Sequence, residues 1–371
     1  MKALCNRDGL LAALGMVSGV VPARSPKPIL QNVKLVVDAE DGSTLMATDL
    51  EVGIRYRVLG IKVDQPGAVI LPTARIGQIL RTSNDDELAI ETEGDHLIVR
   101  GLRSEFSLNL EDPDLFPEVP DFGAQTYHSV AASDLRKLIR RTIFATDVES
   151  TRYALGGVLV ELTAETITMV GTDGRRLARA IATAEAEHNA PNPTGSPVIP
   201  VKALKLIERN LDDSELKVQI AFQSSNSVLI RTERAVIWSK LVEGRFPRYQ
   251  DVFPTGVDIK IPMEAGPLLQ QVEAASIFTS EESRGVDFLF SAGMLTLKSQ
   301  ADVGKSRVEL PLAYDGKDVE ITFDPRYLSD ALKTLDPVAT LTAELIDRKN
   351  AAVFRTTDQY TYVVMPLTKD R

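Results

Sequence analysis

The fold is decided by a stretch that the chain repeats, Arg152-Tyr153-Ala154-Leu155-Gly156-Gly157-Val158-Leu159-Val160-Glu161. It returns as Ser283-Arg284-Gly285-Val286-Asp287-Phe288-Leu289-Phe290, and more faintly as Ile29-Leu30-Gln31-Asn32-Val33-Lys34-Leu35-Val36-Val37. The copies are spaced by about 125 to 130 residues, which is typical of whole domains and too long for solenoid units. The chain is therefore expected to contain three related domains, at residues 1–124, 125–256 and 257–371.

Shorter motifs keep the same spacing. Thr48-Asp49-Leu50 corresponds to Thr172-Asp173-Gly174, and Leu115-Phe116-Pro117 corresponds to Arg245-Phe246-Pro247. Repetition on this scale favours a scaffold over a catalyst, because the function of such a chain tends to lie in the shape of its assembly.

Each repeat has the pattern of helices packed on antiparallel sheets. Apolar residues alternate with polar ones in short runs bounded by Gly, Asp and Asn, and residues 87–99 predict a hairpin around Gly94-Asp95. Six amphipathic helices are predicted, two in each repeat, at residues 8–20, 73–81, 132–145, 201–211, 263–278 and 325–335. Helices with one apolar face against such sheets indicate an α+β fold.

Composition limits the class of protein. The 371 residues carry a net charge of −10, which argues against a chain that coats nucleic acid indiscriminately but allows a local basic patch. A single cysteine, Cys5, excludes a disulfide framework and fits a reducing compartment. The apolar segment 10–21 lacks the features of a secretory signal, and no run is long enough to span a membrane. We expect a soluble, cytoplasmic protein.

Two predicted helices carry basic faces opposite their apolar ones. These cations are Arg136, Lys137, Arg140 and Arg141 in the first, and Lys202, Lys205 and Arg209 in the second. In a chain of net negative charge they suit contacts with phosphates, and without an aromatic ladder those contacts would be independent of base sequence. A merely solvated helix face remains the alternative, and residues 263–279 of the third repeat contain no Lys or Arg.

Motifs for catalysis or cofactor binding are missing. There is no phosphate-binding glycine loop, and His96, His128 and His188 lie far apart in the chain. Asp49 and Asp173 could in principle hold the metal of a hydrolase, but their Thr-Asp-Leu and Thr-Asp-Gly settings favour turns in which Asp binds its own backbone. We predict no catalytic residue, metal or cofactor, and keep a metal-dependent hydrolase and an adaptor scaffold as alternatives.

Three stretches resemble a known family. They are Thr172-Asp173-Gly174-Arg175-Arg176-Leu177-Ala178, Leu241-Val242-Glu243-Gly244-Arg245-Phe246-Pro247, and the C-terminal Tyr362-Val363-Val364-Met365-Pro366-Leu367. The chain resembles the bacterial sliding clamps, the beta subunits of DNA polymerase III, over its whole length. The resemblance implies a non-catalytic processivity factor. Its homodimer would close a six-domain ring around double-stranded DNA without sequence preference, with helices lining the hole.

The resemblance also implies three sets of site residues. Contacts with DNA fall on Arg24 and Arg75 in addition to the seven cations of the two basic faces. An apolar pocket would take short linear peptides of the replicative polymerase subunit, the clamp loader, and repair and translesion polymerases. Its residues are Arg152, Leu155, Thr172, Gly174, Arg175, Arg176, Leu177, Pro247, Val252, Val363, Met365, Pro366 and Leu367. The dimer interface would contain Phe106, Leu108, Ile277 and Phe278.

Some positions depart from the family pattern. Arg175, Ala154 and Asp251 replace residues that are usual at the rim of the family's pocket, which puts the choice of peptide in doubt. At the dimer edge, Glu105 in the first repeat faces the possibility of Lys305 and Arg307 in the third. The charge polarity of this edge is therefore expected to be partly reversed.

Overall fold

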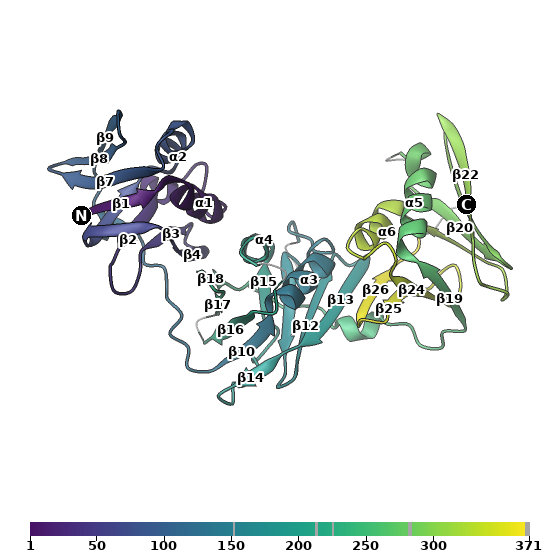
Figure 1. Cartoon of the computed structure of the whole chain (residues 1–371). Helices are drawn as coiled ribbons and strands as arrows, with labels where there is room; N and C mark the ends of the chain where they lie inside the picture. The colour runs from purple at the N-terminus through teal and green to yellow at the C-terminus, as the bar shows by residue number, and fades with distance from the viewer. Residues whose placement is uncertain (151–152, 212–213, 225, 281–283, 368–371) are drawn as a thin grey trace. The chain divides into compact units, whose positions relative to one another are not determined.

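The computed structural model describes residues 1–150, 153–211, 214–224, 226–280 and 284–367 (Figure 1). The chain forms two compact units, the first made of residues 1–133, 185–191 and 202–241, and the second of residues 134–184, 192–201 and 242–371. The middle repeat contributes to both units, because some of its strands pair with the first repeat and others with the third.

The first unit contains two antiparallel sheets. The larger has nine strands: β14 (Glu185–Glu187), β10 (Tyr127–Ala131), β16 (Lys217–Gln223), β17 (Ser227–Arg231), β18 (Ala235–Lys240), β4 (Val52–Arg57), β3 (Thr44–Thr48), β2 (Val33–Val37) and β6 (Gly67–Leu71), in that order. The smaller has five: β5 (Ile61–Gln65), β1 (Lys2–Asn6), β7 (Glu87–Glu93), β8 (His96–Arg100) and β9 (Glu105–Asn109). Pairing of β18 with β4 makes the larger sheet continuous from the first repeat into the second.

The second unit repeats this plan. Its larger sheet has eight strands: β15 (Val198–Pro200), β11 (Gly157–Leu162), β12 (Thr166–Thr172), β13 (Arg176–Thr183), β26 (Tyr360–Val364), β25 (Ala352–Thr356), β24 (Thr340–Leu345) and β19 (Ile259–Glu264). Its smaller sheet has four: β22 (Gly304–Pro311), β21 (Met294–Ala301), β20 (Val286–Ser291) and β23 (Val319–Phe323). Here β13 and β26 join the second repeat to the third.

All six predicted helices are present among the described residues (Figure 1). They are α1 (Arg7–Val17), α2 (Thr73–Thr82), α3 (Ala132–Ile143), α4 (Val201–Arg209), α5 (Ala265–Ala275) and α6 (Pro325–Leu332). Four short 3₁₀ segments accompany them: η1 (Pro28–Gln31), η2 (Pro113–Leu115), η3 (Tyr249–Val252) and η4 (Ser276–Phe278). The α+β prediction is therefore confirmed.

Each helix differs from the prediction by one to three residues at one or both ends, and two cases have a clear cause. The helix expected from residue 263 begins at Ala265, because Met263 and Glu264 pair with β24 as the end of β19. The first helix ends at Val17, where the Ser18 N–H donates to the Leu14 carbonyl, and does not reach residue 20. Its N-terminus is capped by the side chain of Asn6, which accepts from the Gly9 N–H.

The helices pack on the sheets through their apolar faces, as amphipathic helices do. At one place the approach is very close: a Cβ added to Gly171 on β12 would lie 2.2 Å from the carbonyl oxygen of Thr142 in α3. Only glycine allows the last turn of α3 to rest directly on this strand. In the described part of the chain, no helix is both long and apolar enough to cross a membrane.

Candidate functional site

Two equivalent turns lie where sheets of successive repeats join. In the β12–β13 turn, the Asp173 Oδ1 accepts from the backbone N–H groups of Arg175 and Arg176 at 2.9 Å, and the Thr172 hydroxyl donates to the Arg176 carbonyl at 2.7 Å. The β3–β4 turn has the same bonds one repeat earlier. There the Asp49 Oδ1 accepts from the N–H groups of Glu51 and Val52, and the Thr48 hydroxyl donates to the Val52 carbonyl.

For the two aspartates, the sequence left two roles open, an acceptor within a turn and a metal ligand, and these bonds show the first. Each carboxylate serves as the acceptor of a turn, as the sequence predicted, and is fixed against its own backbone. Among the described residues, no cluster of His, Cys, Asp and Glu could hold a metal ion. The two carboxylates that the hypothesis of a metal-dependent hydrolase needs therefore have structural roles.

Arg176 is the centre of a network of polar contacts in the second unit. Its guanidinium donates to Asp173 at 3.0 Å, to Asp330 of α6 at 2.7 Å and to the carbonyl of Phe144 at 2.8 Å. It also lies over the rings of Phe144 and Tyr327, at 5.3 and 4.6 Å from their centres. Burial opposes the charge, but these partners raise the pKa of Arg176, so it remains a cation. We call this set of contacts the Arg176 network.

A cavity of about 660 Å³ opens beside this network in the second unit. Nine of the predicted pocket residues line it: Thr172, Gly174, Arg175, Arg176, Leu177, Pro247, Val252, Val363 and Met365. The sequence reasoning placed Asp251 at the rim but missed the other lining residues: Tyr249, Phe253, Pro254, Thr255, Ile346, Lys349, Asn350 and Ala351. Most of these lie in loops, where no periodic pattern marks the wall of a cavity.

Three of the predicted pocket residues that the structure describes do not line the cavity. Leu155 is only 7% exposed and packs in the core cluster behind it. Pro366 is not in the lining, and Leu367 is directed elsewhere, because its N–H donates to the Thr322 carbonyl beside β23. Arg152 lies outside the described residues.

The floor of the cavity is continuous with an apolar core. Leu177, Tyr249 and Val363 belong both to the lining and to a buried cluster, and Phe253 packs against that cluster. The Tyr249 hydroxyl donates to Glu161 at 2.7 Å, which fixes the segment after Pro247 at the wall. A preformed apolar floor with few polar groups is typical of sites for small ligands and peptide anchors.

The rim of the cavity is charged. The Arg175 guanidinium is exposed and donates to the Tyr327 hydroxyl at 3.5 Å, and this contact raises the pKa of Arg175. Exposed Asp251 and Lys349 provide charges of opposite sign. Ala154 is completely buried in the core cluster, so it contributes nothing to the rim.

The basic face of α3 is smaller than the sequence predicted. Lys137 and Arg140 are exposed and Arg136 is partly buried, but the Arg141 side chain is only 6% exposed. Arg141 pairs with Asp358 at 2.9 Å and lies over the ring of Tyr360 at 5.2 Å. The Arg141 guanidinium is therefore engaged inside the fold, and its contact with phosphate stays a prediction.

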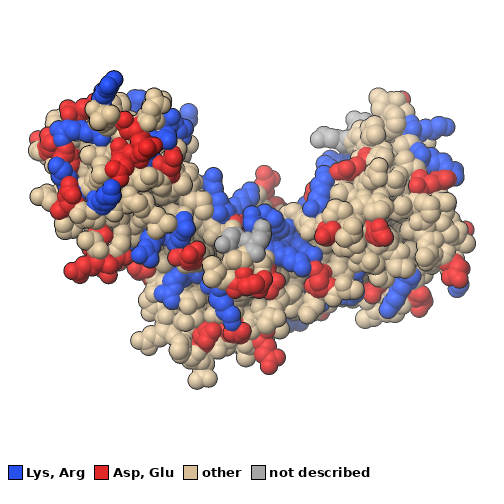
Figure 2. All heavy atoms as spheres, in the orientation of Figure 1, with Lys and Arg blue, Asp and Glu red and all other residues tan. Residues whose placement is uncertain are grey.

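On the basic face of α4, in the first unit, one cation is paired within the chain. The Lys202 ammonium pairs with Asp49 and also donates to the Val20 carbonyl. Burial acts to raise the pKa of Asp49, but the hydrogen bond from Lys202 helps to hold it below its ordinary value. The remaining predicted phosphate contacts of this unit are exposed: Arg24, Arg75, Lys205 and Arg209. Figure 2 shows Lys and Arg side chains over the region of α3 and acidic ones spread over other surfaces.

Two strands lie at free edges of the smaller sheets. β9 ends the five-stranded sheet and carries Phe106 and Leu108, while β22 ends the four-stranded sheet. Ile277, in η4, is 72% exposed, and Phe278 packs its ring against Gly304 at the start of β22. Exposed backbone edges with apolar neighbours are suited to pairing with another chain.

The charges of these edges are partly paired within the chain. Glu105 on β9 accepts from Arg100 at 2.7 Å, and Arg100 is shared with Glu91 and Glu93. Glu91 also pairs with Lys2 at 3.2 Å, so two cations serve three carboxylates, of which Glu105 alone lies on β9. On β22, Lys305 and Arg307 are exposed, and Arg307 pairs with Glu309.

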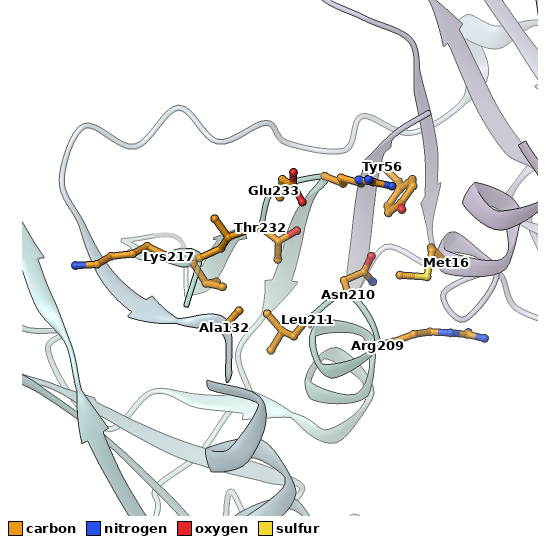
Figure 3. Close-up of a pocket in the computed structure, with 12 residues that line it drawn as sticks. Met16, Tyr56, Ala132, Arg209, Asn210, Leu211, Lys217, Thr232 and Glu233 are labelled. Atoms are coloured by element: carbon orange, nitrogen blue, oxygen red, sulfur yellow. The ribbon is translucent and has the colours of Figure 1, made fainter. Parts of the chain in front are cut away.

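A smaller cavity lies at the C-terminal end of α4 in the first unit (Figure 3). Its volume is about 230 Å³, and its lining residues are Met16, Tyr56, Ala132, Arg209, Asn210, Leu211, Leu216, Lys217, Val218, Thr232, Glu233 and Arg234. In Figure 3 the Arg209 and Lys217 side chains point away from it. Because it is smaller than the roughly 300 Å³ at which ligand pockets begin, we assign it no ligand.

Comparison with known proteins gives one consistent result. Three models of the DNA polymerase III beta subunit match the chain in order: the N-terminal domain at residues 1–120, the central domain at 129–248 and the C-terminal domain at 250–368. The beta sliding clamp of Pseudomonas putida is 32% identical over 368 residues, which cover 98% of each chain. That of Chlamydia pneumoniae is 30% identical over 372 residues and 99% of each chain. The crystal structure of a sliding clamp from Pseudomonas aeruginosa bound to griselimycin has a TM-score of 0.92 at 30% identity and covers both chains completely.

The pair between Asp358 and α3 generates a prediction about stability. Partial burial acts to raise the pKa of Asp358, but contacts from Lys137, Thr356 and Arg141 hold it well below its ordinary value of 3.8. A depressed folded pKa means that this stabilisation is present at neutral pH and is lost as the pH falls below 3.8. We expect Asp358→Asn to lower the free energy of unfolding at pH 7 by about 1 to 3 kcal/mol, less than for a fully buried pair because Asp358 is partly exposed.

Urea denaturation at several pH values measures this effect. The difference between wild type and Asp358→Asn should shrink in acid, where the wild-type carboxylate becomes protonated. Exposed Asp64 supplies the control, since Asp64→Asn should change stability by less than about 0.5 kcal/mol. A difference that is constant from neutral to acid pH would contradict the assignment.

Proposed function

The chain belongs to the family of bacterial DNA polymerase III beta subunits, the sliding clamps, and we propose that it encircles duplex DNA as a ring of two copies. It is a non-catalytic processivity factor associated with polymerase III. The proposal is supported above all by the family match through all three repeats, which gives every part of such a ring a counterpart in this chain. It places the protein in the cytoplasm and its domains at residues 1–124, 125–256 and 257–371.

The dimensions of such a ring suit duplex DNA. Two copies with six helices each, spaced by about 10 Å, would place the helix centres on a circle about 38 Å across. Subtracting a helix radius of about 5 Å on each side leaves on the order of 28 Å for a hydrated duplex. Exposed cations of α3 and α4 would then face phosphates without reading bases, which permits sliding.

The cavity beside the Arg176 network is proposed as the tether for other proteins. Its apolar floor suits the anchoring side chains of short linear peptides, and its rim of Arg175, Asp251 and Lys349 would select among them. The expected partners are the replicative polymerase subunit, the clamp loader, and repair and translesion polymerases.

Retention on circular DNA tests the encirclement. The protein loaded on a nicked circular plasmid should stay bound through gel filtration in high salt, because the closed ring cannot leave the circle. Linearising the plasmid with a restriction enzyme should release it. An adaptor that never encircles DNA would be lost equally from circles and linear fragments, and that outcome would remove the ring from the proposal.

Griselimycin provides a probe of the pocket. A relative has been crystallised with this compound, and we expect this chain to bind it in the cavity lined by Met365. Met365 is 43% exposed, so Met365→Ala should leave thermal stability unchanged and weaken griselimycin binding about tenfold, the loss of about 1.4 kcal/mol. Val338→Ala, at an exposed site outside the cavity, is the control. Equal affinity in the two variants would place griselimycin elsewhere.

The Glu105 carboxylate on the β9 edge predicts how the dimer responds to charge. If Glu105 of one copy faces Lys305 and Arg307 of the other, Glu105→Lys creates like-charge contacts. We expect the dimer dissociation constant to rise about tenfold at low salt, and added salt to reduce the difference. Glu93→Lys also removes a carboxylate partner of Arg100. Because Glu93 lies on β7, away from the edge strand, it serves as the matched control. Sedimentation showing an unchanged dissociation constant and salt dependence in Glu105→Lys would rule out the reversed polarity.

A further inference from the structure

The Arg176 network connects the cavity with the end of a helix. Arg176 lines the cavity, and its guanidinium also donates to the carbonyl of Phe144, the residue that follows α3. The last carbonyls of a helix have no partners within it and carry partial negative charge, so a cation there is strongly held. One side chain therefore takes part in both the cavity wall and the termination of α3.

A second contact makes this connection stiff. The last turn of α3 rests on β12 through Thr142 and Gly171, where there is no room for even a methyl group. β12 continues directly into Thr172 and the turn that lines the cavity. A shift of the end of α3 must therefore move the turn, because packed backbones this close do not slide independently.

Residues of the third repeat also contact Arg176. Asp330 and Tyr327 of α6 both contact the Arg176 guanidinium, and the Tyr362 hydroxyl of β26 donates to the Tyr327 carbonyl at 2.8 Å. β26 leads into Met365, whose N–H donates to the Arg175 carbonyl at the cavity rim. Two parts of the lining, the β12–β13 turn and the segment at Met365, are thus connected through the contacts of one guanidinium.

We propose that Arg176 is a positioning residue that couples two binding events, the binding of DNA phosphates along α3 and the binding of a peptide-like ligand in the cavity. Each event is expected to strengthen the other. The inference rests on the proposed function. Because the end of α3 and the turn move together, a ligand that holds one also holds the other, and the second ligand then removes less freedom when it binds. By thermodynamic reciprocity, DNA must raise the affinity of the cavity for its ligand by the same factor as the ligand raises that for DNA.

The experiment measures the dissociation constant of griselimycin by fluorescence anisotropy, with and without a saturating short blunt-ended duplex at low salt. For the wild type we expect DNA to tighten griselimycin binding about fivefold, and griselimycin to tighten DNA binding by the same factor. Arg176→Lys keeps the charge but cannot span three acceptors, so the coupling factor should fall to about one. The coupling factor is the ratio of the griselimycin dissociation constants without and with DNA. This ratio separates coupling from any change in affinity that Arg176→Lys causes by altering the cavity wall.

Two further variants secure the interpretation. Asp330→Asn leaves Arg176 in place but removes the charge of its carboxylate partner on α6, and should lower the coupling even if Arg176→Lys fails to fold. Arg355→Lys is the matched control, because Arg355 also lies over a cavity residue, Phe253, but pairs with Glu344 and Thr361 of the sheet and not with a helix. Its coupling should equal that of the wild type.

The outcomes separate this inference from the function on which it rests. Equal griselimycin affinity with and without DNA in the wild type would overturn the coupling, as would weaker binding with DNA or an unchanged factor in both Arg176→Lys and Asp330→Asn. Failure of the wild type to bind either griselimycin or DNA would instead count against the proposed function.

Discussion

At each of the two places where strands of successive repeats pair, one cation joins the aspartate of a turn to a carbonyl near the end of a helix. Lys202 does this for Asp49 and Val20, and Arg176 does it for Asp173 and Phe144. The carboxylate and the carbonyl are both negative, so without the cation they would repel each other at short range.

The rest of each larger sheet depends on this arrangement. Arg176 is also the first residue of the pairing between β13 and β26, opposite Val364, and Val52 holds the corresponding place opposite Ser239 between β4 and β18. The turn, the helix end and the start of the strand pair between repeats are therefore fixed together. A shift of one residue in this register would turn every core side chain of the strand to the wrong face.

Equivalent junctions nevertheless differ in what they offer to a ligand. In the first, Gly53 has no side chain, and a Cβ there would lie 2.9 Å from Val119, so the segment at the end of the first repeat packs directly on the strand. In the second, Leu177 takes the place of that glycine, and the Tyr249 hydroxyl donates to Glu161. Leu177 and Tyr249 both line the 660 Å³ cavity, so a larger side chain stands here where the first junction has a glycine in contact with Val119.

The sequence predicted those features that depend on local or repeated patterns. The turn bonds of Asp49 and Asp173 follow from short motifs, and the helices follow from apolar periodicity. Arg141 could not be placed in this way, because a helical projection shows only that it lies off the apolar stripe. Its partner Asp358 comes from a turn more than two hundred residues later, and such distant contacts leave no mark in the local pattern. Leu367 was assigned to the cavity with its neighbours, but its N–H bonds the backbone beside β23 and its path diverges from that of Met365.

The loss of Arg141 from the basic face has a consequence for how such a ring holds DNA. Lys137 and Lys202 also have carboxylate partners within the chain, so fewer unpaired charges remain on α3 and α4 than the sequence suggests. Each phosphate contact adds about 0.9 to the steepness with which the logarithm of the DNA affinity falls with the logarithm of the salt concentration. A protein with many such contacts would be held tightly at each position along the duplex. A ring that retains DNA by its closed shape needs only enough charge to centre the duplex. Internal ion pairs that stiffen the helices while reducing their net attraction to phosphate therefore serve sliding better than a full row of free cations would.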